Sequence, residues 1–173
     1  MMRFVVLDTE TTGFVRGKGL SVCHGHRIIE VACVEIEDGV CTGNDFHVYV
    51  DPGMDVDPAA VRVHGITSDF LRGKPQFKDI ADALIAFIGG SPVVIHNAPF
   101  DIAFLDNEFN LLVDQPTVTF KYIDTLELAR EMFPGFKNDL NSLCARAGFD
   151  GRGKHGALVD ARLLAGVFLK LFI

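Results

Sequence analysis

The stretch Phe4-Val5-Val6-Leu7-Asp8-Thr9-Glu10 determines how the rest of this chain is interpreted. Its four apolar residues predict a short buried strand, and the acidic residues follow where that strand delivers its carboxyl end. Because residues two apart in a strand point to the same face, Asp8 and Glu10 would present two carboxylates on one side. Taken alone, such a pair more often marks a solvated strand end than a functional site.

Two later clusters place further acids at the starts of predicted helices. His96-Asn97-Ala98-Pro99-Phe100-Asp101 follows a short apolar run, and His155-Gly156-Ala157-Leu158-Val159-Asp160 opens the last helical segment. Each acid alone is expected to be an N-cap or to lie favourably in the helix dipole. That interpretation does not explain three acidic element ends, two of them beside a histidine. Four converging carboxylates would repel one another unless cations lay between them, and hard divalent ions with such ligands cut phosphodiesters.

Composition limits the class of protein. A length of 173 residues and a hydrophobic fraction of 49% predict one domain, residues 1–173, with a substantial core. No apolar run reaches ~18 residues, so no membrane span is expected. The formal net charge of −7 argues against long-range attraction to duplex nucleic acid, but not against an enzyme that holds a few nucleotides through bound metal. Without a C-x-x-C pair or a signal peptide, the four cysteines predict reduced thiols in a cytoplasmic protein.

Hydrophobic periodicity predicts three antiparallel strands and then alternating helices and strands. The first strands are expected at Phe4–Leu7, Arg27–Glu37 and Phe46–Val50, with a hairpin turn at Asp38-Gly39. The later elements are expected to be helices Pro58–Val63 (N-cap Asp57) and Phe77–Ile88, strand Val93–Ile95, helix Asp101–Leu112, strand Tyr122–Ile123, and helices Thr125–Met132, Asp139–Ala147 and Ala157–Leu171. This order predicts an α/β fold with a mixed five-stranded sheet flanked by helices.

Two other motifs carry weaker signals. Cys23-His24-Gly25-His26 could bind zinc, but its ligands are crowded and no second ligand pair follows, so a surface loop is the preferred interpretation. Gly151-Arg152-Gly153-Lys154-His155-Gly156 matches G-x-G-x-x-G. It follows no clear strand, however, and the remaining residues are too few for a dinucleotide-binding unit.

His155 lies in this glycine-rich loop, directly before the last predicted helix. A lone histidine is usually structural or exposed, but a mobile neutral imidazole beside a water molecule could act as general base at physiological pH. Arg152 and Lys154 could meet a substrate backbone, and a solvated loop explains them equally well.

With these motifs the chain resembles the histidine-bearing branch of the DEDD superfamily of 3′→5′ exonucleases. The resemblance rests on D-T-E-T-T-G from Asp8, H-N-A-P-F-D from His96 and H-G-A-L-V-D from His155. Each motif is weak to moderate alone, but the three in this order are very specific. The likeness extends over roughly Arg3 to Leu171 and is strongest toward the proofreading (epsilon) subunits of bacterial DNA polymerase III. It implies a ribonuclease-H-like fold.

The resemblance also implies two Mg²⁺ or Mn²⁺ ions and a role for each motif residue. Asp8 would bridge both ions, Glu10 and Asp160 would complete the ion on the nucleophile side, and Asp101 would hold the second ion. His155 would take a proton from the attacking water. The implied catalytic residues are therefore Asp8, Glu10, Asp101, His155 and Asp160. The pocket for the terminal nucleotide would be lined by Thr11, Phe14, Val63, His64, Asn97 and Phe100, with core packing as the alternative for the two phenylalanines.

The leading functional prediction is a metal-dependent 3′→5′ exodeoxyribonuclease that releases 5′-mononucleotides from single-stranded or frayed DNA 3′ ends, as in proofreading. A mismatched end frays more readily, so the cost of unstacking would favour it as substrate. The alternatives are an RNA-trimming enzyme similar to ribonuclease T or an oligoribonuclease, and an inactive scaffold module of a replication complex. The presence of all four acids and of the histidine speaks against the scaffold.

The resemblance further implies that partners could include the polymerase III catalytic subunit and a small accessory subunit. The sequence departs from the family pattern at Ala59, where relatives often carry an acid, and at Pro99, which replaces a small residue. The epsilon subunits usually continue into a tail that binds the clamp and the polymerase. This sequence is therefore expected to be a catalytic domain alone or a short relative, and polymerase docking cannot be inferred from it.

Overall fold

A five-stranded sheet forms the centre of the computed structural model, which describes residues 2–17, 19–112, 118–150, 153 and 155–173. The strands are β1 (Arg3–Thr11), β2 (Ile28–Glu37), β3 (Val40–Tyr49), β4 (Val93–Ile95) and β5 (Tyr122–Asp124). They lie in the order β3-β2-β1-β4-β5. The first three pair antiparallel, whereas β4 runs parallel to β1 and β5 parallel to β4. The predicted mixed sheet is thus confirmed.

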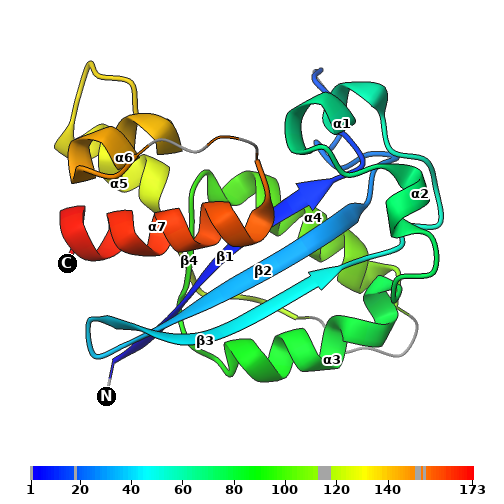
Figure 1. Ribbon diagram of the computed structural model, residues 1–173, viewed down its shortest axis with the longest axis horizontal. Helices are drawn as coiled ribbons and strands as arrows, with labels where there is room; N and C mark the ends of the chain where they lie inside the picture. Colours follow the sequence, from blue (N-terminus) through cyan, green and yellow to red (C-terminus); the bar gives the residue numbers. More distant parts are fainter. Residues whose placement is uncertain (1, 18, 113–117, 151–152, 154) are drawn as a thin grey trace.

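The helices cover both faces of this sheet (Figure 1). They are α1 (Pro58–His64), α2 (Ser68–Leu71), α3 (Phe77–Ile88), α4 (Ala98–Asn110), α5 (Thr125–Met132), α6 (Leu140–Ala147) and α7 (Ala157–Leu171). Residues of α3 and α4 pack in one core cluster, and residues of α6 and α7 pack in another on the opposite face. Among the described residues, no helix combines the length and the apolar character needed to cross a bilayer.

β1 is buried on both faces because each face meets a helical layer. Leu7 packs in the cluster that contains α3 and α4, whereas Val6 packs in the cluster that contains α6 and α7. Since successive residues of a strand point to opposite faces, even-numbered residues face α7 and odd-numbered residues face α4. The strand keeps its pairing with β2 beyond its apolar part, through Asp8 and Glu10. It therefore directs both carboxylates toward α7 and Thr9 toward α4.

Several boundaries differ from the prediction, each for a physical reason. β3 begins at Val40 rather than Phe46. The prediction missed its first half because that part of the edge strand is exposed and shows no apolar alternation. α4 begins at Ala98 rather than Asp101, because Pro99 lies in the first turn, where a helix needs no backbone N–H. The single turn of α2 was not predicted at all.

Three smaller expectations concern loops and caps. Asp57 precedes α1 as predicted, but its side chain makes no capping hydrogen bond. The surface-loop interpretation of the Cys23 segment is wrong for Cys23 itself, whose side chain is buried in the core cluster beneath α3 and α4. The glycine and basic residues Gly151, Arg152 and Lys154 lie outside the described residues.

A buried carboxylate joins α4 to the start of β2. Glu108, on α4, is almost fully buried and accepts hydrogen bonds from Arg27 Nε at 2.8 Å and Arg27 Nη2 at 2.6 Å. The backbone N–H of Ile28 donates to the same carboxylate at 2.9 Å. Glu108 therefore satisfies a guanidinium and a backbone donor at once.

We expect Glu108→Ala to lower the free energy of unfolding by about 3 kcal/mol, the low end for a broken buried ion pair, because Arg27 is partly exposed. The measurement is urea unfolding followed by circular dichroism. Asp69→Ala, which removes the exposed pair between Asp69 and Arg72, is the control and should cost less than about 1 kcal/mol. Equal losses in the two variants would contradict this account of α4.

Candidate active site

A cavity of about 400 Å³ opens at the carboxyl end of β1. Its walls come from β1, the segment after β4, α4, the start of α6 and the start of α7. The lining residues are Asp8, Thr9, Glu10, Phe14, His96, Asn97, Phe100, Asp101, Asp139, Leu140, His155 and Asp160. All four acids and the histidine that the sequence analysis selected thus face one space.

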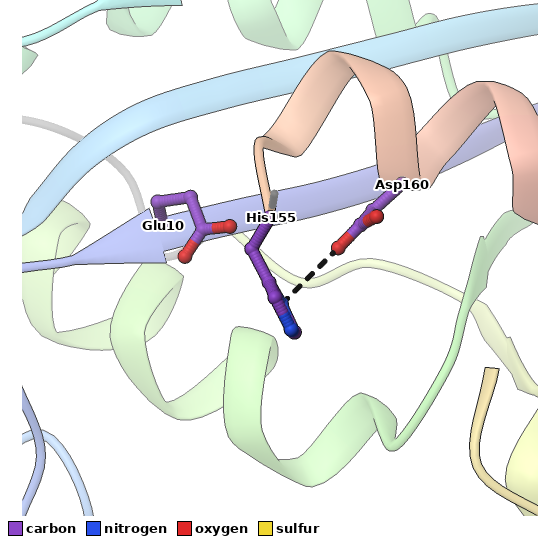
Figure 2. Close-up of side chains that lie close together, drawn as sticks. All are labelled: Glu10, His155 and Asp160. Atoms are coloured by element: carbon purple, nitrogen blue, oxygen red, sulfur yellow. Dashed lines mark ion pairs between the residues drawn. The ribbon is translucent and has the colours of Figure 1, made fainter. Parts of the chain in front are cut away.

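Glu10, His155 and Asp160 form a compact group of possible metal ligands in this cavity (Figure 2). One possible ligand atom from each lies within 4.8 Å of the other two. His155 Nδ1 is 3.6 Å from Asp160 Oδ2. Asp160 is almost fully buried in the first turn of α7, whereas the His155 side chain is 36% exposed. Such a group could hold a divalent cation through its carboxylate oxygens.

Asp101 reaches the end of β1 from the opposite helical layer. Its Oδ1 accepts hydrogen bonds from the Thr9 backbone N–H at 3.1 Å and from the Thr9 hydroxyl at 2.7 Å. Burial raises the pKa of Asp101 to about 7; the Thr9 hydrogen bonds oppose the rise and the charge of Asp124 adds to it. A buried carboxylate whose charge is so poorly compensated by protein groups has the chemistry of a cation ligand.

Asp124 holds together the ends of the two short parallel strands. Its Oδ1 accepts the Asn97 N–H at 3.0 Å and, as the cap of α5, the Leu126 N–H at 2.9 Å. Asn97 adopts a left-handed conformation (φ 68°, ψ 52°), which asparagine tolerates better than most residues. Nearby, His96 Nδ1 lies 3.0 Å from the Thr125 hydroxyl. These hydrogen bonds hold the sharp turn from β4 into α4 in place, so that His96 and Asn97 line the cavity.

Glu30 fixes the start of α7 to the sheet. It pairs with Glu10 in the β1–β2 ladder and is 2% exposed. Its Oε2 accepts the Ala157 N–H at 3.1 Å, and its Oε1 lies 2.7 Å from His47 Nε2. The hydrogen bond from Ala157 satisfies a backbone donor at the first residue of α7. It thereby sets the position from which Asp160 enters the cavity.

The six residues predicted to bind a nucleotide divide into two groups. Phe14, Asn97 and Phe100 line the cavity, and the Phe14 ring meets the Phe100 ring edge-on at 5.7 Å. The other three do not line it; they are Thr11, Val63 and His64. Of these, Val63 is 49% exposed on α1.

His64 is buried beside the cavity. Its Nδ1 accepts the Ile66 N–H at 3.0 Å, so the neutral ring carries its proton on Nε2. Burial lowers the pKa of His64, which favours that neutral ring. Nε2 lies near the backbone of Thr11 and completes no hydrogen bond within the described part of the chain. The Thr11 hydroxyl donates instead to the Gly13 carbonyl at 3.0 Å.

Four lining residues were not selected from the sequence: Thr9, His96, Asp139 and Leu140. His96 stands inside a quoted motif, and this proximity could have identified it. Asp139 was interpreted only as a helix start, a role that it does fill by accepting the Ser142 N–H at 3.1 Å. The positions of Thr9 and Leu140 follow from tertiary packing, and no local signal marks them.

Comparison with known proteins gives consistent matches. The sequence profile described as "Exonuclease" matches residues 5–168. The DNA polymerase III epsilon subunits of Escherichia coli and Pasteurella multocida are 50% and 45% identical to the chain. Each alignment covers 98% of this chain, and 71% and 68% of those proteins respectively.

Two solved structures resemble this chain over almost its full length. Exonuclease X in complex with 5′ overhanging duplex DNA has a TM-score of 0.73 and 27% identity, over 96% of this chain and 89% of that one. The nuclease domain of 3′hExo, a DEDDh family member bound to rAMP, has a TM-score of 0.80 over 98% and 90% of the two chains. Its identity of 19% supports the shared fold alone.

In the metal-free protein, we expect Asp101→Asn to change the dependence of stability on pH. The folded-state pKa near 7 exceeds the ordinary value of 3.8, so the contribution of Asp101 is fully present below about pH 4 and is lost as pH rises through 7. Asparagine keeps the Oδ1 acceptor and cannot ionise. The variant should therefore gain up to roughly 4 kcal/mol over the parent at pH 8 in chelator.

Urea unfolding between pH 4 and pH 8 measures this difference. Asp69→Asn, on an exposed side chain, is the control and should follow the parent curve. Curves for the parent and for Asp101→Asn that stay parallel across this range would refute the raised pKa.

Proposed function

The chain belongs to the exonuclease family, and we propose that it is a metal-dependent 3′→5′ exonuclease acting on single-stranded or frayed DNA ends. The observation that carries this proposal is the convergence of four carboxylates and His155 on one cavity at the end of β1. Identities of 50% and 45% to DNA polymerase III epsilon subunits support proofreading during DNA replication as its biological role.

Asp8, Glu10, Asp101 and Asp160 are proposed to hold two divalent cations, Mg²⁺ or Mn²⁺. The donor set supports this assignment, because carboxylate oxygens are the ligands that these hard ions prefer. The raised pKa of Asp101 supports it as well, since the protein supplies that carboxylate with too little positive charge. When bound, the cations would act as Lewis acids on the phosphate and would favour deprotonation of water.

His155 is proposed as the general base. It lies beside Asp160 at the cavity, and its 36% exposure lets it pass a proton on to solvent. It would take one proton from the water whose oxygen attacks the terminal phosphorus. The bond from phosphorus to the 3′-oxygen then breaks, and that oxygen takes up a proton from solvent to become the 3′-hydroxyl of the shortened strand. A 5′-mononucleotide is released.

The terminal nucleotide is proposed to lie against Phe14 and Phe100, whose rings offer apolar surfaces of the kind on which any base can stack. Asn97 lines the same space. The protonated Nε2 of His64 is a buried donor near the backbone of Thr11, and we assign this pair to the ribose or its 3′-hydroxyl. Val63, which is exposed on α1 next to His64, would complete the apolar surface.

The biological setting is an extension of the same proposal. The relatives are named as subunits of DNA polymerase III. By analogy, this chain would work in the cytoplasm beside the polymerase catalytic subunit and a small accessory subunit. An RNA-trimming exonuclease of the same fold is the alternative, and the first experiment must distinguish it from the DNA exonuclease.

We expect the protein to shorten a primer with a mismatched 3′ end in Mg²⁺ or Mn²⁺, and to stop when a chelator is added. Asp8→Ala should abolish nucleotide release while the circular dichroism spectrum stays unchanged, because the cations would lose their shared ligand. Asp69→Ala is the matched control and should remain active. Full activity of Asp8→Ala would refute the site, and a faster rate on the equivalent RNA oligomer would refute the DNA assignment.

We expect His155→Ala to reduce the turnover rate by ~10²–10⁴, the usual contribution of general acid–base catalysis. The rise of the rate toward neutral pH should disappear with it, because imidazole changes charge in this pH range. Rates between pH 5.5 and 9 provide the measurement, with the exposed His24→Ala as the control. A variant profile that retains the rise would assign the base to another group.

A further inference from the structure

A second cavity, of about 640 Å³, adjoins the proposed active site. Both cavities are lined by His96, Asn97 and Asp139, so they share a wall at the turn from β4 into α4. We propose that this second cavity binds the nucleotide on the 5′ side of the scissile bond, together with its 5′-phosphate. The inference rests on the proposed function, because it requires a strand whose 3′ end occupies the first cavity.

Two basic side chains give the second cavity a charge that suits phosphate. Arg130 extends from α5 and Lys137 from the loop before α6, and both residues are exposed. Among the described residues, neither side chain forms an ion pair of 4.0 Å or less. In a chain of net charge −7, two such cations in a cavity that adjoins a carboxylate-lined site would attract the phosphates of a polyanionic strand.

Phe136 supplies an aromatic surface in the same cavity. It is 70% exposed, the largest exposure among the large hydrophobic side chains in the described residues. An exposed phenyl ring beside cations suits single-stranded nucleic acid, because bases stack on aromatic faces without regard to sequence. Stacking of this kind matches an enzyme that must accept every base in turn.

Arg146 holds the loop that presents Phe136 and Lys137. Its Nη1 donates to Asn138 Oδ1 at 2.8 Å and its Nη2 to the Lys137 carbonyl at 2.6 Å. Its guanidinium carbon lies 5.5 Å from the centre of the Phe136 ring. Because these interactions order the loop before any ligand arrives, binding there would cost little conformational entropy.

Asp139 is the acidic exception in this cavity. Its carboxylate is used at the start of α6, where Ser142 donates to it through its N–H at 3.1 Å and its hydroxyl at 2.8 Å. These hydrogen bonds lower the pKa of Asp139, so it stays charged. The charge of Lys137 also lowers this pKa, so Lys137 lies near Asp139. We assign the phosphate to Arg130 and Lys137 together, and the base to Phe136.

The experiment compares substrates of increasing length. The p-nitrophenyl ester of thymidine 5′-phosphate would fill the first cavity only, whereas thymidine oligomers of three and eight nucleotides would reach the second. For Arg130→Ala/Lys137→Ala, we expect an unchanged kcat/KM on the ester and a decrease of about tenfold or more on the oligomers, mainly through KM. The plot of log(kcat/KM) against log(salt) has a negative slope. Its magnitude should decrease by about 0.7 for each phosphate that the variant no longer neutralises.

Phe136→Ala should lower kcat/KM for the oligomers without changing the salt slope, because it removes stacking and no charge. Arg72→Ala/Lys78→Ala, with the same change in net charge at exposed positions outside both cavities, is the matched control and should leave the length dependence intact. Equal decreases on the ester and the oligomers, or no decrease at any length, would overturn the inference. A parent protein inactive on every substrate would refute the proposed function itself.

Discussion

The burial of carboxylates around the end of β1 is the constraint on which the rest of the structure depends. Asp101 and Asp160 are 4% and 2% exposed, and removing such charges from water is costly unless they are compensated. The Thr9 hydrogen bonds compensate Asp101 only in part, because its pKa remains raised. The negative charge of these buried carboxylates is thus poorly compensated, and divalent cations would compensate it. In their absence the folded state is less stable, at the site where the chemistry is proposed.

The alternation of β1 explains how distant segments meet there. Its even-numbered face directs Asp8 and Glu10 toward α7, while its odd-numbered face offers Thr9 to α4. Each helix needs its own anchor, and two buried acids provide them: Asp124 at the turn into α4 and Glu30 at the start of α7. The groups proposed for catalysis are therefore positioned by carboxylates that accept hydrogen bonds from protein donors.

Local patterns were enough to predict the order of all elements except α2, from hydrophobic periodicity, and to predict that Asp8 and Glu10 share one face of β1, from the strand period. They did not predict that Asp139 would line the cavity or that His64 would lie outside its lining, because neither position depends on neighbours in sequence. The exposed half of β3 was missed for a related reason, since an edge strand without a buried face lacks the alternation that identifies strands.

The pairing of β1 with α7 has a consequence for biosynthesis. A ribosome adds Asp8 and Glu10 about 150 residues before it adds Asp160. Until α7 emerges and its first N–H reaches Glu30, the nascent polypeptide lacks one side of the cavity. The hydrolytic site would then be complete only after α7 has packed against the sheet.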